Sequence, residues 1–239
     1  MSGSLLSRAA LPLVAVAAAL LGAGTTWLVS RNTSGDEIRA YLLAHPEVLP
    51  EAMDVLNRRE MAKTISASRD DIVKPFGTAW AGNPNGDVEV VEYLDYNCGY
   101  CRASLPTVDA LIAADPKVKV VYREWPVLSQ ESLIAARYGL ALARLGGDYR
   151  KFHAAAYAAH PLTEQGIEDA VRAAGADPAE VKKAISAPEI DGAIVTNGQL
   201  MRALGQTGTP SWIIGDKVVS SALPLEELQK AVAAARAKG

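Results

Sequence analysis

Two cysteines, Cys98 and Cys101, are the residues whose type and spacing point most directly to chemistry, and they are the only cysteines among the 239 residues. Thiols this close could form a structural disulfide, hold a metal ion or exchange disulfides with another molecule. A tetrahedral zinc site needs four ligands, and the three histidines, His45, His153 and His160, are distant in sequence. A chain of this length does not depend on one disulfide for stability. Redox exchange is therefore the favoured interpretation, and no metal or other cofactor is expected.

The residues around the pair predict a strand that leads into a helix. Residues 88–96, "VEVVEYLDY", are β-branched and aromatic, and a helix is expected from the cysteines to about Ala114. A helix N-terminus carries free N–H groups and partial positive charge, which favour a thiolate. We therefore expect Cys98 to have a lowered pKa and to attack, and Cys101, one turn later, to resolve the mixed disulfide. Tyr100 is expected to pack beside an incoming peptide.

Glu92 is an acidic residue within a mainly apolar predicted strand, six residues before Cys98. Burying a carboxylate is costly, so a role is expected for it. A buried acid beneath the pair could accept the proton of Cys101 as that sulfur attacks. The alternative is a surface residue on an edge strand.

Thr209 and Pro210 precede the apolar segment "SWIIG". A cis bond before Pro210 would leave the backbone N–H and C=O of Thr209 free to pair with a substrate strand. Because a cis bond is the minority state before proline, the sequence pattern alone does not establish it.

The rest of the chain predicts helices and strands in an α/β order with a helical insertion. Helices are expected over residues 34–72, with breaks at Pro46 and Pro50, over the Ala-rich stretch from Gln130 to Leu204, and after Pro224. Strands are expected over residues 117–125 and on both sides of Gly215–Asp216. The Gly-, Pro- and Asn-rich residues 74–88 are expected to form a linker. Residues 34–72 leave two alternatives open: a helix packed on its own domain, or an oligomerisation arm.

The N-terminus carries an uncharged run between Arg8 and Arg31. Its length and apolar character fit a cleaved secretory signal or an uncleaved signal anchor over residues 9–30. Both place the remainder outside the cytoplasm. The net charge of −3, the sequence pI of about 5.7 and the absence of a basic run give no support to a nucleic-acid partner.

In combination these motifs resemble the thioredoxin fold: CxxC after a strand, an acid six residues earlier, Pro106 within the next helix, and "GTP" before a hairpin. The long helical stretch resembles the insertion of the DsbA-like branch. The segments "GNPNGDVEVVEYLDYNCGYC", "GTPSWIIG" and "IRAYLLAHPEVLPEAM" are similar to DsbA-like proteins related to ScsC, the suppressor of copper sensitivity protein C. The resemblance covers roughly residues 36–235.

The expected organisation follows from this resemblance. It is an α/β thioredoxin fold over residues 74–239 with a helical insertion at about 129–204, preceded by a helical arm over 33–73 and a signal peptide or signal-anchor helix over 1–32.

The resemblance also implies roles for single residues. Cys98 is expected to be the attacking thiol, Cys101 the resolving thiol, Glu92 the buried acid, and Thr209–Pro210 the cis-proline loop. Two departures from DsbA matter: Tyr100 stands where DsbA has His, and Thr209 where it has Val. Without the imidazole of that His, the thiolate loses one stabilising partner, so we expect a pair that is less oxidising than that of DsbA. The Thr is common among isomerases and reductases of the resembling families, so it speaks against a strict oxidase.

The expected function is periplasmic thiol–disulfide exchange as an isomerase or reductase, with the protein tethered to the inner membrane by residues 9–30. The expected partners are unfolded or misoxidised periplasmic proteins, a membrane redox partner, and further copies of the chain through residues 36–70. Three alternatives stay open: a disulfide-forming oxidase, a copper-tolerance protein that holds Cu(I) between the two thiols, and a membrane-tethered scaffold with an inert disulfide.

Overall fold

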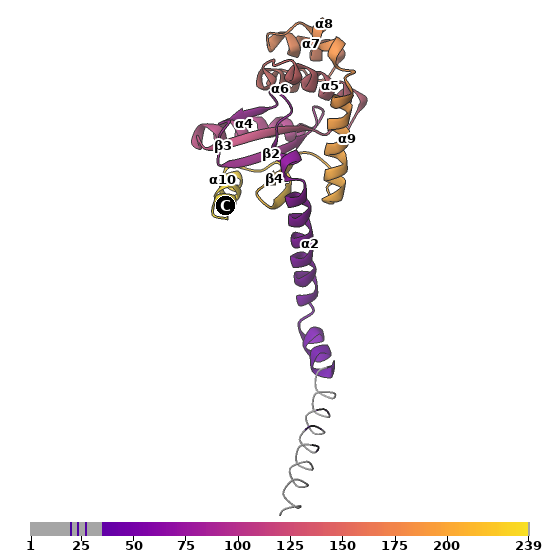
Figure 1. Cartoon of the computed structure of the whole chain (residues 1–239), viewed down its shortest axis with the longest axis vertical. Coiled ribbons are helices and arrows are strands. Elements are labelled where there is room, and N and C mark those ends of the chain that lie inside the picture. Colours follow the sequence, from indigo (N-terminus) through magenta and orange to yellow (C-terminus); the bar gives the residue numbers. More distant parts are fainter. Residues whose placement is uncertain (1–19, 21–22, 24–26, 28–34, 239) are drawn as a thin grey trace, which may run out of the picture. The chain divides into compact units, whose positions relative to one another are not determined.

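The structure is a computed structural model that describes residues 20, 23, 27 and 35–238 (Figure 1). Apart from residues 20, 23 and 27, the expected signal or anchor segment lies outside the described residues. Within the described part of the chain, no helix has both the length and the apolar character needed to cross a bilayer. The chain divides into two compact units, residues 1–57 and 58–239.

The first unit contains a helix over residues 35–44 and the beginning of α2 (Val48–Ala67). The break expected near Pro46 is present, but α2 continues through Pro50. Pro50 is tolerated because it lies in the first helical turn, where N–H groups have no intrahelical acceptor. Large apolar side chains of this unit are exposed: Ile38, Tyr41, Leu43, Leu49, Met53, Val55 and Leu56.

The second unit is built on a five-stranded mixed sheet with the order β1-β3-β2-β4-β5. Its strands are β1 (Trp80–Gly82), β2 (Val88–Leu94), β3 (Val118–Glu124), β4 (Ser211–Ile214) and β5 (Lys217–Ser220). Strands β2 and β3 are parallel, whereas the other neighbouring pairs are antiparallel. Strand β1 lies in the stretch expected to be only a linker, and its pairing with the edge of β3 explains its formation.

Helices cover both faces of the sheet and form a separate group between β3 and β4 (Figure 1). They are α3 (Arg69–Val73), α4 (Gly99–Ala114), α5 (Gln130–Arg144), α6 (Tyr149–Ala158), α7 (Glu164–Ala173), α8 (Pro178–Ala184), α9 (Pro188–Ala203) and α10 (Leu225–Arg236). The expected insertion is thus the group α5 to α9, and the hairpin expected at Gly215–Asp216 joins β4 to β5.

Alternate residues of β2 enter two different apolar cores. Val90 and Leu94 belong to the core that also holds the two cysteines and parts of α4 and α10. Val91 and Tyr93 belong to the opposite core, with Ile65 of α2 and Ile72 of α3 among its residues. Residues 58–73 therefore pack on the sheet. Of the two alternatives that the sequence left open for residues 34–72, packing on the chain's own domain holds for this part.

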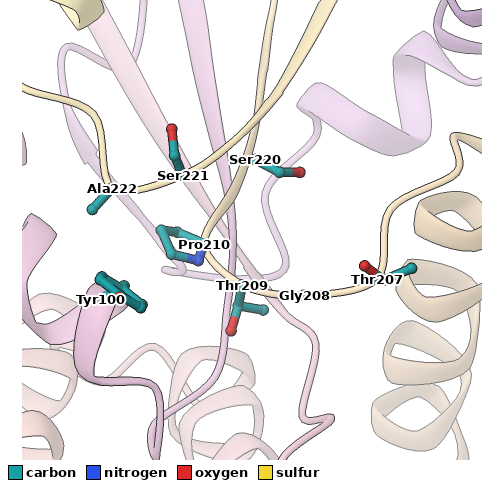
Figure 2. Close-up of a pocket in the computed structure, with 8 residues that line it drawn as sticks. All are labelled: Tyr100, Thr207, Gly208, Thr209, Pro210, Ser220, Ser221 and Ala222. Atoms are coloured by element: carbon teal, nitrogen blue, oxygen red, sulfur yellow. The ribbon is translucent and has the colours of Figure 1, made fainter.

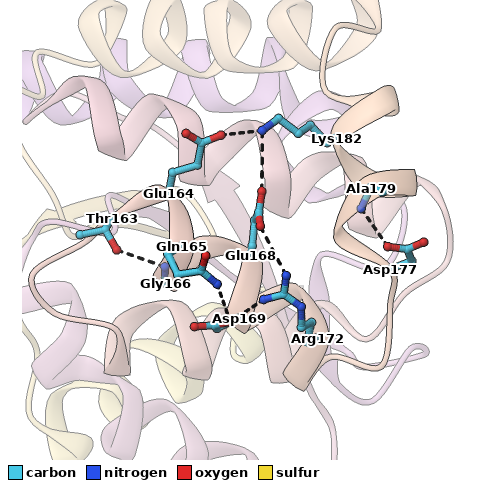
Figure 3. A network of polar contacts seen from close by, with 10 residues as sticks. All are labelled: Thr163, Glu164, Gln165, Gly166, Glu168, Asp169, Arg172, Asp177, Ala179 and Lys182. Carbon is cyan, nitrogen blue, oxygen red and sulfur yellow. Dashed lines mark hydrogen bonds and ion pairs between the residues drawn. The ribbon is translucent and has the colours of Figure 1, made fainter.

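The insertion is held at its outer side by capped helices and a surface network of charges (Figure 3). Thr163 caps α7 and Asp177 caps α8, each accepting a backbone N–H bond. Lys182 of α8 pairs with Glu164 and Glu168 of α7. These pairs are largely exposed, so they orient the two short helices and contribute little to stability.

Candidate active site

The two cysteines lie at the start of α4, where the chain leaves the central strand β2. Cys98 is the N-cap residue of α4 and Cys101 lies in its first turn. Both carry free thiols, with 6% of Cys98 and 1% of Cys101 exposed. The Cys98 thiol donates a hydrogen bond to the Thr209 carbonyl at 3.1 Å. The fold therefore joins residues that are 111 positions apart in the chain.

The surroundings of the two sulfur atoms drive their pKa values in opposite directions. A hydrogen bond from Cys101 is the largest cause that lowers the pKa of Cys98 to about 5, helped by the Thr209 hydroxyl and by the Cys101 and Tyr100 N–H groups. Burial is the largest cause that raises the pKa of Cys101, followed by its hydrogen bond to Cys98 and the charge of Glu92. The surroundings therefore favour a thiolate at Cys98 and a thiol at Cys101.

Glu92 lies beneath this pair in the interior of the sheet. It pairs with Tyr122 of β3 on one side and with Trp212 of β4 on the other, and it is 2% exposed. The alternative of a surface residue on an edge strand is therefore wrong. Burial, and then the charges of Cys98 and Glu124, raise the pKa of Glu92 to about 8. A carboxyl group with this pKa can both take up and release a proton near neutral pH.

Thr209 presents three backbone and side-chain groups at the cysteine site. The bond from Thr209 to Pro210 is cis. Within residues 35–238, the Thr209 N–H has no hydrogen-bond acceptor, while the carbonyl accepts from Cys98. The hydroxyl Oγ1 is buried and has no partner while Cys98 is a thiol. The same hydroxyl lowers the pKa of Cys98, because an O–H group can donate to a thiolate.

A pocket of about 490 Å³ opens beside the Thr209–Pro210 bond (Figure 2). Figure 2 shows the Tyr100 side chain of α4 on one side of the hollow and Pro210 on the other. Tyr100 is 70% exposed, which is unusual for an aromatic residue in a folded domain. The remaining lining comes from Thr207–Thr209 and Ser220–Ala222. The pocket therefore brings Tyr100, Thr209 and Pro210 to one surface.

Asp95 is a residue of this region that the sequence did not single out. Its carboxylate accepts from the Asn97 N–H at 2.8 Å and the Ser132 hydroxyl at 2.6 Å, and from the N–H groups of Val127 at 2.7 Å and Leu128 at 2.9 Å. The group is 1% exposed. Asp95 thus ties the turn before Cys98 to the loop after β3 and to α5.

Glu124 is a second buried acid that the sequence analysis missed. It is fully buried at the end of β3 and accepts from the hydroxyls of Tyr96 at 3.0 Å and Tyr149 at 2.5 Å. Its other oxygen, Oε2, has no partner among the described residues. A weaker signal was present, because Glu124, like Glu92, is an acid within a predicted strand, but Lys117, Lys119 and Arg123 share that strand.

Comparison with known proteins places this arrangement in a family. The family model described as "Thioredoxin" matches residues 76–234, and that described as "Copper resistance protein ScsC N-terminal domain" matches residues 35–63. The chain belongs to the thioredoxin family. Within it, the chain is a protein thiol–disulfide oxidoreductase of the DsbA-like group related to ScsC. No match to a curated protein was found.

Solved structures agree with this assignment. A thioredoxin-like oxidoreductase from Silicibacter pomeroyi DSS-3 is 39% identical, with 71% of this chain and 98% of that one covered and a TM-score of 0.67. The thiol-disulfide exchange protein alpha-DsbA2 from Wolbachia pipientis is 34% identical, with 74% and 96% covered and a TM-score of 0.67. A linker-deletion mutant of Proteus mirabilis ScsC is 23% identical, with 84% and 92% covered and a TM-score of 0.71, and shows likeness of fold alone.

Proposed function

We propose that this protein exchanges disulfides with protein substrates in the periplasm, as an isomerase or reductase, with Cys98 as its attacking thiol. The observation that carries the proposal is the asymmetry of the pair. The pKa of Cys98 is lowered to about 5, whereas burial raises the pKa of Cys101. The Cys98 sulfur can therefore attack as a thiolate, whereas the Cys101 sulfur remains a thiol until the resolving step.

The proposed cycle has two exchanges. The Cys98 thiolate attacks a substrate disulfide, forms a mixed disulfide and releases one substrate sulfur as a thiolate. Cys101 then gives its proton to the Glu92 carboxylate and attacks the Cys98 sulfur, which releases the second substrate thiolate. The substrate gains two electrons, and the protein keeps a Cys98–Cys101 disulfide. In isomerisation, a substrate thiol instead attacks the mixed disulfide and regenerates Cys98.

The substrate is proposed to bind as an extended strand at Thr209. The free N–H of Thr209 supports this, because such a group can pair with the backbone of an added strand. The adjoining pocket, with Tyr100 and Pro210 in its lining, has room for a side chain next to the substrate cysteine. Because the contacts to the backbone carry no sequence information, we propose broad acceptance of unfolded or misoxidised chains.

Two features support reduction or isomerisation over oxidation. A pKa of about 5 at Cys98 lies between the values of about 7 in thioredoxin and about 3.5 in DsbA. A less acidic attacking thiol gives a less strongly oxidising pair. The exposed apolar side chains of the first unit, such as Tyr41, Leu49 and Met53, support assembly of several copies through the part of residues 36–70 that precedes residue 58. Several active sites around one substrate favour isomerisation.

The cellular location and the redox partner are proposed from a solved relative, from the apolar run near the N-terminus and from the reaction cycle. A periplasmic thioredoxin-like protein from Salmonella enterica serovar Typhimurium is 27% identical over 71% of this chain. This likeness and the apolar run after Arg8 support a periplasmic location, and the run further supports a tether at residues 9–30. A membrane protein is the proposed source of electrons, because the pair must be reset after each reduction.

Refolding of scrambled ribonuclease with the full chain tests the function. We expect recovery of ribonuclease activity, its loss in Cys98→Ser, and a trapped mixed disulfide in Cys101→Ser. Thiol trapping in cells tests the direction, since an isomerase or reductase keeps Cys98 and Cys101 mostly reduced. A pair that is mostly oxidised in cells would instead establish an oxidase.

The name of the matched N-terminal family, a copper resistance protein, is the observation that favours a second candidate. Two soft thiolates suit Cu(I), and Cys98 and Cys101 lie three residues apart at the start of α4. Titration of the reduced protein with Cu(I) in a competing chelator tests this. Binding that is lost in Cys98→Ser, in a protein without exchange activity, would favour copper binding over the proposed exchange.

A further inference from the structure

Two buried carboxyl groups lie on the same face of the sheet beneath the cysteine helix. In the parallel pairing of β2 with β3, Glu92 is opposite Tyr122 and Leu94 is opposite Glu124. Since every second residue of a strand faces the same side, Glu92 and Glu124 are diagonal neighbours on adjacent strands. Both are at most 2% exposed. Only Glu92 is used in the exchange cycle described above.

Glu124 accepts hydrogen bonds from residues of three parts of the chain: the turn after β2, helix α6 and helix α9. Tyr96, after β2, and Tyr149, of α6, donate their hydroxyls to its carboxyl group. The Tyr96 hydroxyl also contacts His153 of α6 at 3.3 Å. From α9, the Asn197 amide donates to the Glu124 carbonyl at 2.9 Å. These contacts join the insertion to the sheet at one acid.

None of these neighbours, within the described residues, supplies a positive charge. Burial lowers the pKa of His153 to about 3, so its ring is neutral. Asp95 adds a further negative charge, which raises the pKa of Glu124. Among these neighbours, a charge on Glu124 therefore has no cation to balance it, and this charge raises the pKa of Glu92.

Helix α5 makes room for the acid. At Gly139 a Cβ atom would stand 3.0 Å from Glu124 Oε1 and 2.8 Å from Phe152 Cε1. The absence of a side chain at this position lets the helix pass close to the carboxyl group. The acid is thus closely fitted by α5 and α6, yet its Oε2 atom has no partner among the described residues. A buried oxygen without a partner is costly for a group whose role is only structural.

Electrostatics connect this group to the cysteines. The charge of Glu124 is one of the causes that raise the pKa of Glu92, and Glu92 in turn raises the pKa of Cys101. Burial raises the pKa of Glu124 itself to about 8, and its hydrogen bonds from Tyr149 and Tyr96 oppose this rise. The two acids therefore titrate in the same range and cannot both ionise readily.

We propose that Glu124 is a positioning residue of the exchange reaction, which shares one proton with Glu92 and thereby sets when Glu92 can accept the proton of Cys101. This rests on the proposed exchange cycle and deepens it. In the resolving step, the S–H bond of Cys101 breaks, the proton moves to Glu92, and the Cys101 thiolate attacks Cys98. Glu124 takes no part in bond making; it limits the fraction of Glu92 that is ionised.

The reaction with the aromatic disulfide DTNB separates the two steps. Cys98 attacks first and releases one thionitrobenzoate, and Cys101 then resolves the mixed disulfide and releases a second. In Glu124→Gln we expect the pH midpoint of the second phase to move downward. Its rate at neutral pH should rise roughly three- to tenfold, the factor that a midpoint shift of half to one unit gives.

A double-mutant comparison shows whether the effect passes through Glu92. Glu124→Gln should cause no further shift of the midpoint in a Glu92→Gln protein. An unchanged midpoint in the single variant, or the same shift in both backgrounds, would overturn the inference. Tyr149→Phe keeps the acid but removes a donor that favours its charged form, so a smaller shift in the same direction is expected. If Glu124→Gln does not fold, the shift measured in Tyr149→Phe decides the question.

The same measurements separate this inference from the function it rests on. The unaltered protein must show both phases, and Cys101→Ser must lack the second phase. If it does not, the exchange cycle fails whatever Glu124 does. If both phases behave as expected while the Glu124 variants leave the midpoint unmoved, only the role of Glu124 is refuted.

Discussion

The Cys98 sulfur lies 3.1 Å from the Thr209 carbonyl oxygen, so the start of α4 and the residue before Pro210 meet at one atom pair. This contact favours the thiol form, because a thiol can donate to a carbonyl and a thiolate cannot. The Thr209 hydroxyl works in the opposite sense and lowers the pKa of Cys98. One residue therefore stabilises both forms of the attacking sulfur, through two different groups.

Replacing Thr209 by Val removes the hydroxyl and keeps the shape and the backbone. We expect the pKa of Cys98 to rise and its alkylation rate below neutral pH to fall, because the thiolate loses a donor. Thiolate absorbance and iodoacetamide kinetics as functions of pH measure both effects. Thr209→Ser keeps the hydroxyl and serves as the control. Equal titration curves for the Val and Ser variants would count against a role for the hydroxyl.

The reduction potential of the pair follows from the acidity of Cys98. With a pKa of about 5, the thiolate is less stabilised than in DsbA and more than in thioredoxin. We expect a potential between the two, roughly in the range from −270 to −120 mV, measured by equilibration with glutathione. A value as oxidising as that of DsbA would contradict this prediction and would also weaken the proposal of an isomerase or reductase.

The stability of the protein should depend on pH through Glu92. Its pKa is raised from an ordinary value of 4.5 to about 8 in the folded state. The stabilising contribution of the bound proton is fully present below pH 4.5 and is lost as the pH rises through 8. Glu92→Gln should remove this loss and raise the free energy of unfolding at neutral pH by roughly 1–3 kcal/mol. Urea denaturation at several pH values measures it, with the exposed Glu47→Gln as control.

The sequence predicted those parts of the site that lie in short, patterned segments. Cys98, Cys101 and Glu92 lie within ten residues of one another, and a strand followed by a helix was readable around them. Thr209 required the resemblance to a family, because its contact with Cys98 spans the helical insertion. Strand β1 was missed because three residues carry too little alternation, and its formation depends on the edge of β3.

The contacts that hold Asp95 and Glu124 could not be predicted from the sequence. Asp95 is held by N–H groups of Val127 and Leu128 and by the Ser132 hydroxyl, which are distant in sequence. The Tyr149 donor to Glu124 lies 25 residues away, in a helix whose position depends on the whole insertion. The hydrogen-bond partners of a buried polar group are brought to it by the fold, so the hydrophobic periodicity of the sequence does not predict them.

Asp95 should be the most sensitive polar position near the cysteines. Asp95→Ala leaves the buried Ser132 hydroxyl and the half-buried backbone N–H groups of Val127 and Leu128 without this acceptor. We expect a loss of roughly 2–4 kcal/mol in the free energy of unfolding, and slower attack by Cys98 because the preceding turn is released. The control is Asp109→Ala, whose exposed pair with Arg150 should be worth less than about 1 kcal/mol. Similar losses of unfolding free energy in both variants would show that the hydrogen bonds of Asp95 contribute no more than an exposed ion pair.

Gly139 and Gly192 offer a matched test of how tightly α5 packs over Glu124. Both glycines are helical, but a Cβ atom at Gly139 would meet Phe152 Cε1 at 2.8 Å and Glu124 Oε1 at 3.0 Å, while Gly192 has open space. Gly139→Ala should destabilise the protein by roughly 1–3 kcal/mol because the core is overpacked. Gly192→Ala should stabilise it by up to about 1 kcal/mol, because alanine favours a helix. Thermal and urea unfolding measure both. A stabilised Gly139→Ala protein would mean that α5 can move away from the buried acid.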